Sequence, residues 1–468
     1  MNLMIKLPIN QRTWQAGDPR RGRRLSIIPW EERIRQLTKS IVLAGVVSLA
    51  ATAGAVANPL PLTPVAFIPV PADAANVQPG GAFSAFDISF ADPVTGNVFI
   101  ADRSNAAVDI FSGSSLTFLG RATGFTGQQA TTSVSGPDGV LTVTTTSGGV
   151  TNTTLYAGDG NSTLKIFNAS NPAAPTVAQA PISTGGNFRV DEMAFSPATG
   201  QILAANNADA PAYGNLFSTT GGHPPVTLGA SPIPVPTIQG GFANGGMEQP
   251  VWNPNTGTFF VSIPQLSIGG ATDPGGVAQI NTSGVVLNTL SFANLGISSC
   301  SPSGLAVGGS GMLVGCGAAT SSGAGAVLLN LTGTAILKTF PGLAGTDEIW
   351  FDPTTKAFYV TGNNGTNTTR FFDVVSDNGS SSTILQQIGL PATISAHSIT
   401  VDPLNGDVFV PIAGTLALNS CPPSANPGCI EVFAPTPLPT ALPLLATGLG
   451  VIGLLGWRRK RKAAAALA

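Results

Sequence analysis

Charged side chains are scarce in this chain of 468 residues: Asp, Glu, Lys and Arg make up 9% of it, and histidine occurs twice. An ordinary soluble domain contains about 25% charged residues. Glycine (57 residues) and proline (38 residues) are abundant instead, and 43% of the chain is hydrophobic, which is enough to bury a core and argues against disorder. Little charge combined with many turn-forming residues, Thr and Val favours short strands joined by tight turns, so we predict an all-β protein.

Basic residues are rarest in the middle of the sequence. Residues 58–434 contain seven Lys and Arg against twenty Asp and Glu, a net charge of −13, and the other basic residues lie towards the two ends. Binding of nucleic acid requires a basic surface, so this composition excludes nucleic acid as a partner. An acidic body is compatible with metal cations and with neutral or cationic ligands.

Cysteine occurs four times, without a Cys-x-x-Cys motif or a Cys/His cluster, which argues against structural zinc. Cys421 and Cys429 flank a short loop, and Cys300 and Cys316 flank a segment with the pattern of two adjacent strands and their turn. Each pair is suited to a disulfide, although four cysteines also allow other connectivities. Disulfides are typical of exported proteins.

Residues 1–57 have the pattern of an export signal with a long basic leader. Basic residues within Arg33–Lys39 precede the apolar run Ile41–Ala57, which ends in the small-x-small sequence Ala-Val-Ala. This pattern predicts a helical signal peptide that is cleaved after Ala57. An uncleaved N-terminal anchor is the alternative, and the basic run Arg20–Arg24 leaves a twin-arginine export route open.

Residues 435–468 divide into the Pro-rich segment Pro435–Pro443, the apolar segment Leu444–Trp457 and the basic cluster Arg458–Lys462. This order, with Thr-Pro-Leu-Pro-Thr-Ala at 436–441, resembles the PEP-CTERM family of bacterial sorting signals in its Val-Pro-Leu-Pro-Ala variant. The resemblance implies cleavage by exosortase-type sorting machinery, after transient membrane contact through the C-terminal segment, and delivery to the cell envelope, cell surface or extracellular matrix. The alternative is a plain C-terminal transmembrane anchor, and the basic cluster would keep its C-terminal end in the cytoplasm.

A phrase of 17 residues recurs along the body of the chain. Each copy has a short apolar strand, a turn built on Pro and usually Gly, and a second alternating strand. Clear copies occupy residues 86–102, 190–206, 247–263, 346–362 and 396–412.

Two weaker copies, aligned on strand pattern alone, raise the number of units to seven, with a period of about 50 residues. Such a period, with four strands in each unit, predicts a seven-bladed β-propeller over residues 58–434. Two stacked β-sandwiches would explain the short strands but not the period. The last unit reaches only a third strand, at Ile430–Phe433, so we expect the N-terminal strand Ala66–Val70 to complete it and close the ring.

Several stretches of the body resemble known propeller repeats. The Asp-Pro-x-Thr-Gly turn resembles YVTN- and NHL-type repeats, and stretches such as ADRSNAAVDI and YAGDGNSTLKI resemble exported bacterial YncE-like propellers. The segment Glu-Gln-Pro-Val-Trp at 248–252 is similar to the Glu-Gly-Pro-x-Trp segment of SMP-30/gluconolactonase-like propellers. That resemblance implies a divalent-metal ligand at Glu248, whereas the Asn ligands of the family have no counterpart here and its catalytic Asp falls near Ser303.

In a propeller the first strand of each blade lines the central channel, so the residue that opens it lies at one channel mouth. The repeat therefore predicts a mainly acidic ring, to which the adjacent Glu192 and Glu348 are expected to add. Oxygen ligands with one histidine suit a divalent cation such as Ca²⁺. The alternative is structural: carboxylates before strands often accept hydrogen bonds from backbone N–H groups. The predicted metal ligands are Asp87, Asp138, Asp191, Glu248, Asp347 and His397.

We therefore expect an exported, surface-sorted protein that binds a small molecule or a matrix component, or serves as a scaffold, in the cell envelope or extracellular matrix. The alternative is a metal-dependent, lactonase-like hydrolase. In that enzyme the bound ion would polarise a carbonyl group, and a carboxylate or His397 would act as the base. The sequence identifies no catalytic residue and does not decide between these functions.

Overall fold

The protein is described by a computed structural model that defines residues 61–219, 226–227, 233–234, 246–266, 273–317, 324–343, 345–363, 370–390, 397–414, 421 and 427–436. The predicted signal peptide and the predicted sorting signal beyond residue 436 lie outside these residues, so both stay predictions. Among the described residues, no helix has the length and apolar character needed to cross a membrane.

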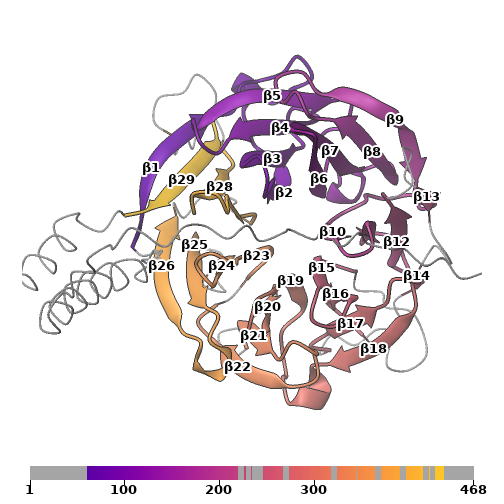
Figure 1. The fold of residues 1–468 in the computed structure, drawn as a ribbon, viewed down its shortest axis with the longest axis vertical. Helices are drawn as coiled ribbons and strands as arrows, with labels where there is room; N and C mark the ends of the chain where they lie inside the picture. Colours follow the sequence, from indigo (N-terminus) through magenta and orange to yellow (C-terminus); the bar gives the residue numbers. More distant parts are fainter. Residues whose placement is uncertain are drawn as a thin grey trace, which may run out of the picture. The chain divides into compact units, whose positions relative to one another are not determined.

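Seven antiparallel sheets follow one another around a ring in the described chain (Figure 1). In the first six, the strands pair in chain order from an inner strand beside the centre to an outer strand at the rim. A short fifth strand, β14, also pairs with β12 in the third sheet. The predicted seven-bladed propeller is therefore confirmed, and the alternative of two stacked sandwiches is wrong.

The blades are numbered one to seven from β2 onwards, and the bounds of their strands are as follows. The inner strands are β2 (Phe86–Ala91), β6 (Val140–Ser147), β10 (Met193–Ser196), β15 (Pro250–Asn253), β19 (Pro302–Val307), β23 (Ile349–Asp352) and β27 (Thr400–Val401). The second strands are β3 (Asn97–Asp102), β7 (Val150–Asp159), β11 (Gln201–Asn206), β16 (Thr258–Ile263), β20 (Met312–Cys316), β24 (Ala357–Asn363) and β28 (Val408–Ile412).

The outer half of each blade completes the sheet. The third strands are β4 (Ala107–Ser112), β8 (Thr163–Asn168), β12 (Tyr213–Ser218), β17 (Gly276–Ile280), β21 (Ala326–Leu329), β25 (Arg370–Ser376) and β29 (Cys429–Pro435). The outer strands are β5 (Thr117–Thr123), β9 (Thr176–Ser183), β13 (Val226–Thr227) with β14 (Ile233–Pro234), β18 (Val286–Ser291), β22 (Ile336–Phe340), β26 (Ile384–Leu390) and β1 (Leu62–Pro69). Four short 3₁₀ turns are described between strands, at Pro79–Gly81, Thr132–Val134, Ala293–Leu295 and Gly379–Ser381.

Strand β1 is the outer strand of blade seven, where it pairs antiparallel with β29. Leu62 lies opposite Pro435 and Pro69 opposite Cys429. On its other side, the side-chain amide of Gln386 in blade six accepts a hydrogen bond from the Leu62 N–H (2.8 Å) and donates one to the Leu62 carbonyl oxygen (3.0 Å). Closure of the ring by an N-terminal strand is therefore confirmed, and it protects the edge of β29 from pairing with another chain.

The Asp-Pro-x-Thr-Gly part of the repeat forms the turn between the first and second strands. In blade one the Asp92 carboxylate accepts hydrogen bonds from the backbone N–H groups of Val94 (3.0 Å) and Thr95 (2.8 Å). Gly96 then adopts φ +68°, a left-handed conformation that glycine reaches without strain. The residues that replace Asp92 in blades three, four, six and seven, with the same kind of hydrogen bond, are Ser196, Asn253, Asp352 and Asp402.

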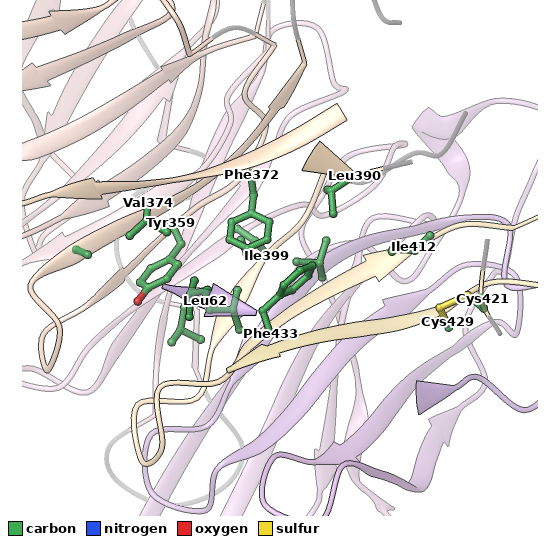
Figure 2. Close-up of a cluster of buried hydrophobic side chains, with 14 residues drawn as sticks. Leu62, Tyr359, Phe372, Val374, Leu390, Ile399, Ile412, Cys421, Cys429 and Phe433 are labelled. Carbon is green, nitrogen blue, oxygen red and sulfur yellow. A yellow bond between two sulfur atoms is a disulfide. The ribbon is translucent and has the colours of Figure 1, made fainter. Parts of the chain in front are cut away.

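Hydrophobic side chains fill the spaces between neighbouring blades. Between blades six and seven, Phe372 of β25 meets Phe433 of β29 edge to face, with ring centroids 4.9 Å apart (Figure 2). Leu62 of the closing strand and the disulfide Cys421–Cys429 belong to the same buried cluster. Closure of the ring is therefore reinforced by apolar packing as well as by strand pairing.

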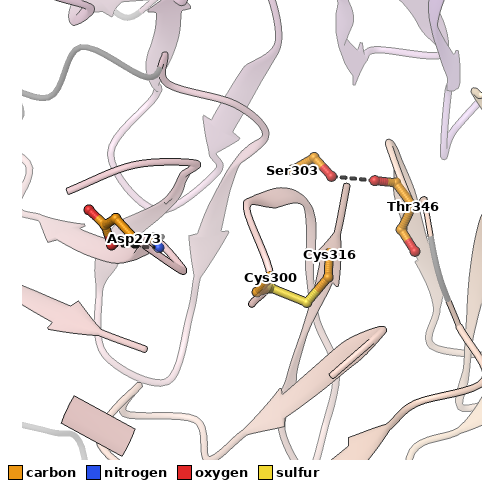
Figure 3. The surroundings of a disulfide bond; sticks show 6 residues. Asp273, Cys300, Ser303, Cys316 and Thr346 are labelled. Carbon is orange, nitrogen blue, oxygen red and sulfur yellow. Dashed lines mark hydrogen bonds between the residues drawn. A yellow bond between two sulfur atoms is a disulfide. The ribbon is translucent and has the colours of Figure 1, made fainter. Parts of the chain in front are cut away.

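Both expected disulfides are present, Cys300–Cys316 with a Cα–Cα distance of 4.5 Å and Cys421–Cys429 with one of 6.1 Å. All four cysteines are therefore paired. The first disulfide connects the entry of blade five to the end of its second strand (Figure 3). It can form because β19 and β20 are antiparallel, with Pro302 opposite Cys316.

Candidate functional site

The residues that open the blades lie at one mouth of the channel, at or just before the start of each inner strand. Asp87 lies within β2, whereas Asp138 and Asp191 precede their strands by two residues. Blade five has Ser303 at this position, and its hydroxyl donates a hydrogen bond to the carbonyl oxygen of Thr346 (Figure 3). The chemistry of the mouth therefore differs from blade to blade, although its backbone repeats.

Two arginines lie among these acidic residues, and neither was predicted from the sequence to belong to the site. Arg103 follows β3, the strand that pairs with β2, and its guanidinium bonds to both Asp87 and Asp138. Arg103 Nε lies 2.8 Å from Asp138 Oδ1, and each of the three side chains is at most 10% exposed. A buried arginine thus connects blades one and two.

Arg189 precedes Asp191 by two residues, and its Nη2 atom lies 2.9 Å from Asp191 Oδ2. Its Nε atom donates to Asn207 Oδ1 (3.0 Å), and Asn207 Nδ2 donates to the same Asp191 carboxylate. Burial, which Arg189 only partly offsets, raises the pKa of Asp191 to about 6. Arg189 also lines a recess of about 290 Å³ at this mouth, together with Glu248.

The remaining residues of the predicted ring, His397, Asp347 and Glu248, interact electrostatically with these charged groups. His397 Nε2 is 3.5 Å from Asp87 Oδ1. Burial alone would raise the pKa of Asp87, but Arg103 and a hydrogen bond with His397 outweigh it and hold that pKa below its usual value. Burial raises the pKa of Asp347. Burial and neighbouring carboxylates raise the pKa of Glu248 to about 8, so this side chain is largely protonated at neutral pH.

The described donor set does not fit a divalent cation. Arg103 already bonds the carboxylates of Asp87 and Asp138, which the prediction assigned to a metal. Within the part of the chain that the structure describes, no three His, Cys, Asp or Glu side chains are arranged to hold a metal ion. Calcium binding and the hydrolase that would depend on it stay predictions, and we derive no reaction step through a metal.

One residue further along the inner strands, polar side chains connect the blades. The side-chain amide oxygen of Gln249 (Oε1) in blade four accepts hydrogen bonds from the N–H groups of Leu305 in blade five (2.6 Å) and Ile349 in blade six (3.1 Å). Gln249 reaches blade six because blade five has Gly304 at the corresponding position, where a Cβ atom would lie 2.8 Å from Ile349 Cγ1.

The same layer continues through blade seven. The Glu348 carboxylate of blade six accepts hydrogen bonds from the Ser398 hydroxyl and the Ile399 N–H (3.1 Å). Ser398 Oγ in turn lies 2.7 Å from the hydroxyl of Ser89 in blade one and accepts a hydrogen bond from the Ser89 N–H (2.8 Å). We call the side chains of Glu192, Gln249, Glu348 and Ser398 the polar layer.

An apolar cavity of about 580 Å³, which we call the channel chamber, is lined by the inner strands of blades one to six. Its lining extends from Glu192 and Glu348 in the polar layer to Pro93 and Pro197 in the turns at the opposite ends of the strands. None of the described lining residues is Lys, Arg or His. Its aromatic residues are Phe90, Phe195, Trp252, Trp350 and Phe351.

Blade seven contributes nothing to the described lining of the chamber. Phe90 of blade one and Trp350 of blade six, the two neighbours of blade seven, meet edge to face with ring centroids 5.3 Å apart. Blade seven allows this contact because it has the small residue Thr400 there, whose hydroxyl accepts a hydrogen bond from the Ala91 N–H (2.9 Å). The aromatic pair thus forms one wall of the chamber.

Glu192 lies at the polar end of the chamber and is 5% exposed. Its Oε2 atom is buried and has no hydrogen-bond partner in the described structure. Burial, together with the charges of Asp191 and Glu248, raises the pKa of Glu192 well above its usual value. Burial likewise raises the pKa of Glu348. This end of the chamber therefore holds two carboxyl groups with no basic residue among its lining.

The structure thus brings the six predicted ring residues to one mouth but separates them from Glu192 and Glu348, which line the chamber. Sequence reasoning missed Arg103 and Arg189. A signal for Arg103 exists in the sequence, because the body has only seven basic residues and Arg103 directly follows a second strand. In an antiparallel hairpin the second strand ends where the first begins, so that position returns to the mouth.

Comparison with known proteins shows the fold alone. No protein-family model matches this chain, and no curated protein matches it significantly. Among solved structures the chain is similar to the Cps50 (Swd1) β-propeller domain of Myceliophteria thermophila, at 11% identity over 80% of this chain and 100% of that one, with a TM-score of 0.51. It is also similar to hydrazine synthase of Kuenenia stuttgartiensis, at 13% identity over 78% of this chain and 99% of that one, with a TM-score of 0.50. At such low identity these similarities place the chain among β-propellers, a fold commonly used for binding and scaffolding, and transfer no activity.

Proposed function

We propose that this protein is an exported binding protein of the cell envelope or extracellular matrix, and that it holds a small molecule in the channel chamber. The observation that carries the proposal is the chamber itself. Its volume of about 580 Å³ falls in the range of roughly 300–1,000 Å³ that is usual for ligand sites. Its walls are mainly apolar and aromatic, with a few polar groups gathered at one end, which is the usual composition of such sites.

Export is supported by features at both ends of the propeller. Both disulfides are typical of an oxidising compartment. Cleavage after Ala57 would leave β1, which begins at Leu62, intact to close the ring. The C-terminal segment with the PEP-CTERM-like pattern follows β29 directly, so sorting machinery of the exosortase type could remove it without disturbing a blade.

Binding is favoured over hydrolysis because arginines already pair with carboxylates at the mouth. A lactonase-like mechanism needs a metal ion with free carboxylate ligands. Arg103 and Arg189 neutralise the carboxylates of Asp87, Asp138 and Asp191 instead. The chamber requires no metal to bind a ligand.

The proposed binding site is tested by a substitution that fills part of the chamber with a larger side chain. Ala306 lines it and is 5% exposed, so Ala306→Trp would occupy part of its volume. The matched control is Val285→Trp, at a residue that is 52% exposed outside the chamber. Full-length protein is purified from its host, and bound small molecules are extracted and identified by mass spectrometry. We expect a compound with the wild type and the control that is depleted by about ten-fold with Ala306→Trp.

The same preparation tests export. We expect the protein in the envelope or medium fraction, with Asn58 as its N-terminal residue. Equal amounts of the extracted compound from the wild type and Ala306→Trp would refute binding in the chamber, and a cytoplasmic protein that retains residues 1–57 would refute export.

A further inference from the structure

We propose, building on the binding function above, that the ligand of the channel chamber is an organic amine. Its ammonium group lies against Glu192 and Glu348, and its apolar body lies between the aromatic side chains of the chamber. Four features of the chamber support this inference: an unpartnered carboxyl group, the position of the arginines, the aromatic walls and the charge around the polar layer.

The two carboxyl groups of the polar layer differ in their hydrogen bonds. Glu348 accepts from Ser398 and from the Ile399 N–H (3.1 Å), so the protein itself supplies its donors. Glu192 Oε2 is buried without a partner in the described structure. A buried polar atom with no partner costs about 1–3 kcal/mol, which a ligand N–H group placed at Glu192 would recover.

The arginines of the mouth do not serve this end of the chamber. Arg103 bonds Asp87 and Asp138, and Arg189 bonds Asp191. Neither arginine is among the residues that line the chamber. These two basic groups are therefore committed to the mouth, and no described residue that lines the chamber supplies a cation to Glu192.

The walls suit the apolar part of such a ligand. Trp252, Trp350 and Phe90 line the chamber and provide aromatic surface for the apolar body of the ligand. The volume of about 580 Å³ accommodates an aromatic or branched aliphatic body. Apolar walls alone would accept a neutral ligand equally well, so the carboxyl groups decide the preference for a cation.

The charged groups that most affect Glu192 are acidic: Asp191, Glu248, Asp347 and Glu348 each disfavour its ionised form. Burial and these charges favour the protonated form, so our inference includes a neutral Glu192 in the ligand-free protein. When the ammonium form of an amine binds, that proton passes to solvent, and an ammonium–carboxylate pair replaces the neutral acid. An anionic ligand would find no basic side chain in the described lining of the chamber to compensate its charge.

Two probes with nearly the same skeleton test the inference: 2-phenylethylamine, which is a cation, and 2-phenylethanol, which is neutral. Binding of each to the full-length protein is measured by titration calorimetry at about pH 7, in two buffers of different ionisation enthalpy. We expect the amine to bind ten-fold or more tighter than the alcohol and to release up to about one proton, because a charged hydrogen bond contributes roughly 1.5–3 kcal/mol.

The variant Glu192→Gln keeps the shape of the side chain and removes its charge. We expect it to weaken amine binding by about ten-fold or more and to change alcohol binding by less than about two-fold. The matched control is Glu431→Gln, a carboxyl group of β29 that is 8% exposed and does not line the chamber. Its amine affinity should equal that of the wild type.

The outcomes separate this inference from the binding function on which it rests. If the alcohol binds as tightly as the amine and no proton is released, the chamber is a site for neutral ligands and the amine inference is wrong. Because proton release is measured on the wild type, that conclusion does not depend on the folding of a variant. If neither probe binds and no compound is extracted from the native protein, the binding function itself is wrong.

Discussion

The inner strands carry acidic residues at both ends, and the two sets are stabilised in different ways. At the turn end, Asp92 and Asp402 accept hydrogen bonds from backbone N–H groups two or three residues further along the chain. At the mouth end, Asp87 and Asp138 depend on Arg103, which is 16 and 35 residues away. Each turn carboxylate is bonded by N–H groups of its own turn, whereas the mouth carboxylates depend on an arginine that is distant in sequence.

This difference explains why one end of the repeated phrase is nearly constant and the other is not. A turn held by its own residues recurs in the five clear copies with Asp, Asn or Ser as its first residue, as Asp352 in blade six illustrates. A mouth residue has to suit neighbours that change around the ring, so blade five has Ser303 and blade seven His397 at the corresponding positions. The mouth and the chamber are therefore the parts of the repeat that can acquire a function.

Removal of the Arg103 charge from the mouth should have the largest effect on the free energy of unfolding. Arg103→Met leaves the buried carboxylates of Asp87 and Asp138 without their counter-charge, which should cost about 3–5 kcal/mol of unfolding free energy, measured by urea denaturation. The exposed Lys356, changed to Met, is the control and should shift stability by about 0.5 kcal/mol or less. The triple variant that adds Asp87→Asn and Asp138→Asn should recover part of the loss. A loss below about 1 kcal/mol for Arg103→Met would contradict a mouth held by ion pairs.

Breaking the turn end should cost less, and unequally between blades. The Asp92 carboxylate accepts hydrogen bonds within its own turn and also from the hydroxyls of Thr142 (2.6 Å) and Thr144 in blade two. The Asp352 carboxylate bonds to N–H groups of its own turn, such as that of Thr354 (2.9 Å). We expect Asp92→Ala to cost about 2–3 kcal/mol and Asp352→Ala about 1 kcal/mol in the same urea experiment. Equal losses would show that the contacts between blades add nothing to the turn.

The carboxyl groups of the mouth should make stability depend on pH. Burial and neighbouring carboxylates raise the pKa of Glu248 to about 8, and burial raises that of Asp191 to about 6. Between the unfolded value near 4.3 and these folded values, the native protein holds protons that the unfolded chain has released, so stability falls as pH rises from about 4.5 to 8. Asp87 behaves in the opposite way: its lowered pKa gives stability that is lost as the pH falls below about 4.

The variant Glu248→Gln tests this pH dependence. It removes one of the protons concerned, so we expect the decline in stability between about pH 5 and 8 to become shallower by up to about 1.4 kcal/mol per pH unit. Thermal unfolding across this range provides the measurement. An unchanged slope for Glu248→Gln would mean that Glu248 is ionised in the folded protein.

The sequence predicted the features of this fold that depend on nearby residues. Period, turns, both disulfides and closure of the ring followed from local patterns, although β1 begins at Leu62 rather than at Ala66. The pairing of Arg103 with Asp138 did not follow, because it requires two blades to be placed side by side. The position of Glu192 next to Asp191 in the sequence was also misleading, because it led us to expect Glu192 in the ring at the mouth. Successive residues of an extended chain point in opposite directions, which places Asp191 at the mouth and Glu192 in the chamber.

The smallest change in stability is expected for a substitution in the turn of blade six. Lys356 in blade six adopts φ +53° at the position where Gly257 of blade four adopts φ +66°. A side chain in the left-handed region costs about 1 kcal/mol or more, partly offset by the greater freedom of glycine in the unfolded chain, so Lys356→Gly should stabilise the protein by up to about 1 kcal/mol.

The reverse changes separate backbone strain from packing in these turns. A Cβ atom at Gly257 would have no neighbour within 4 Å, whereas at Gly96 it would lie 2.9 Å from Asp402 Oδ2 in blade seven. Gly257→Ala should therefore cost only the backbone strain, about 1 kcal/mol, and Gly96→Ala should cost more because the contact with Asp402 must also give way. Equal losses in urea denaturation would mean that the turn of blade one moves away from blade seven without penalty. A loss of stability for Lys356→Gly would mean that contacts of the lysine side chain outweigh its backbone strain.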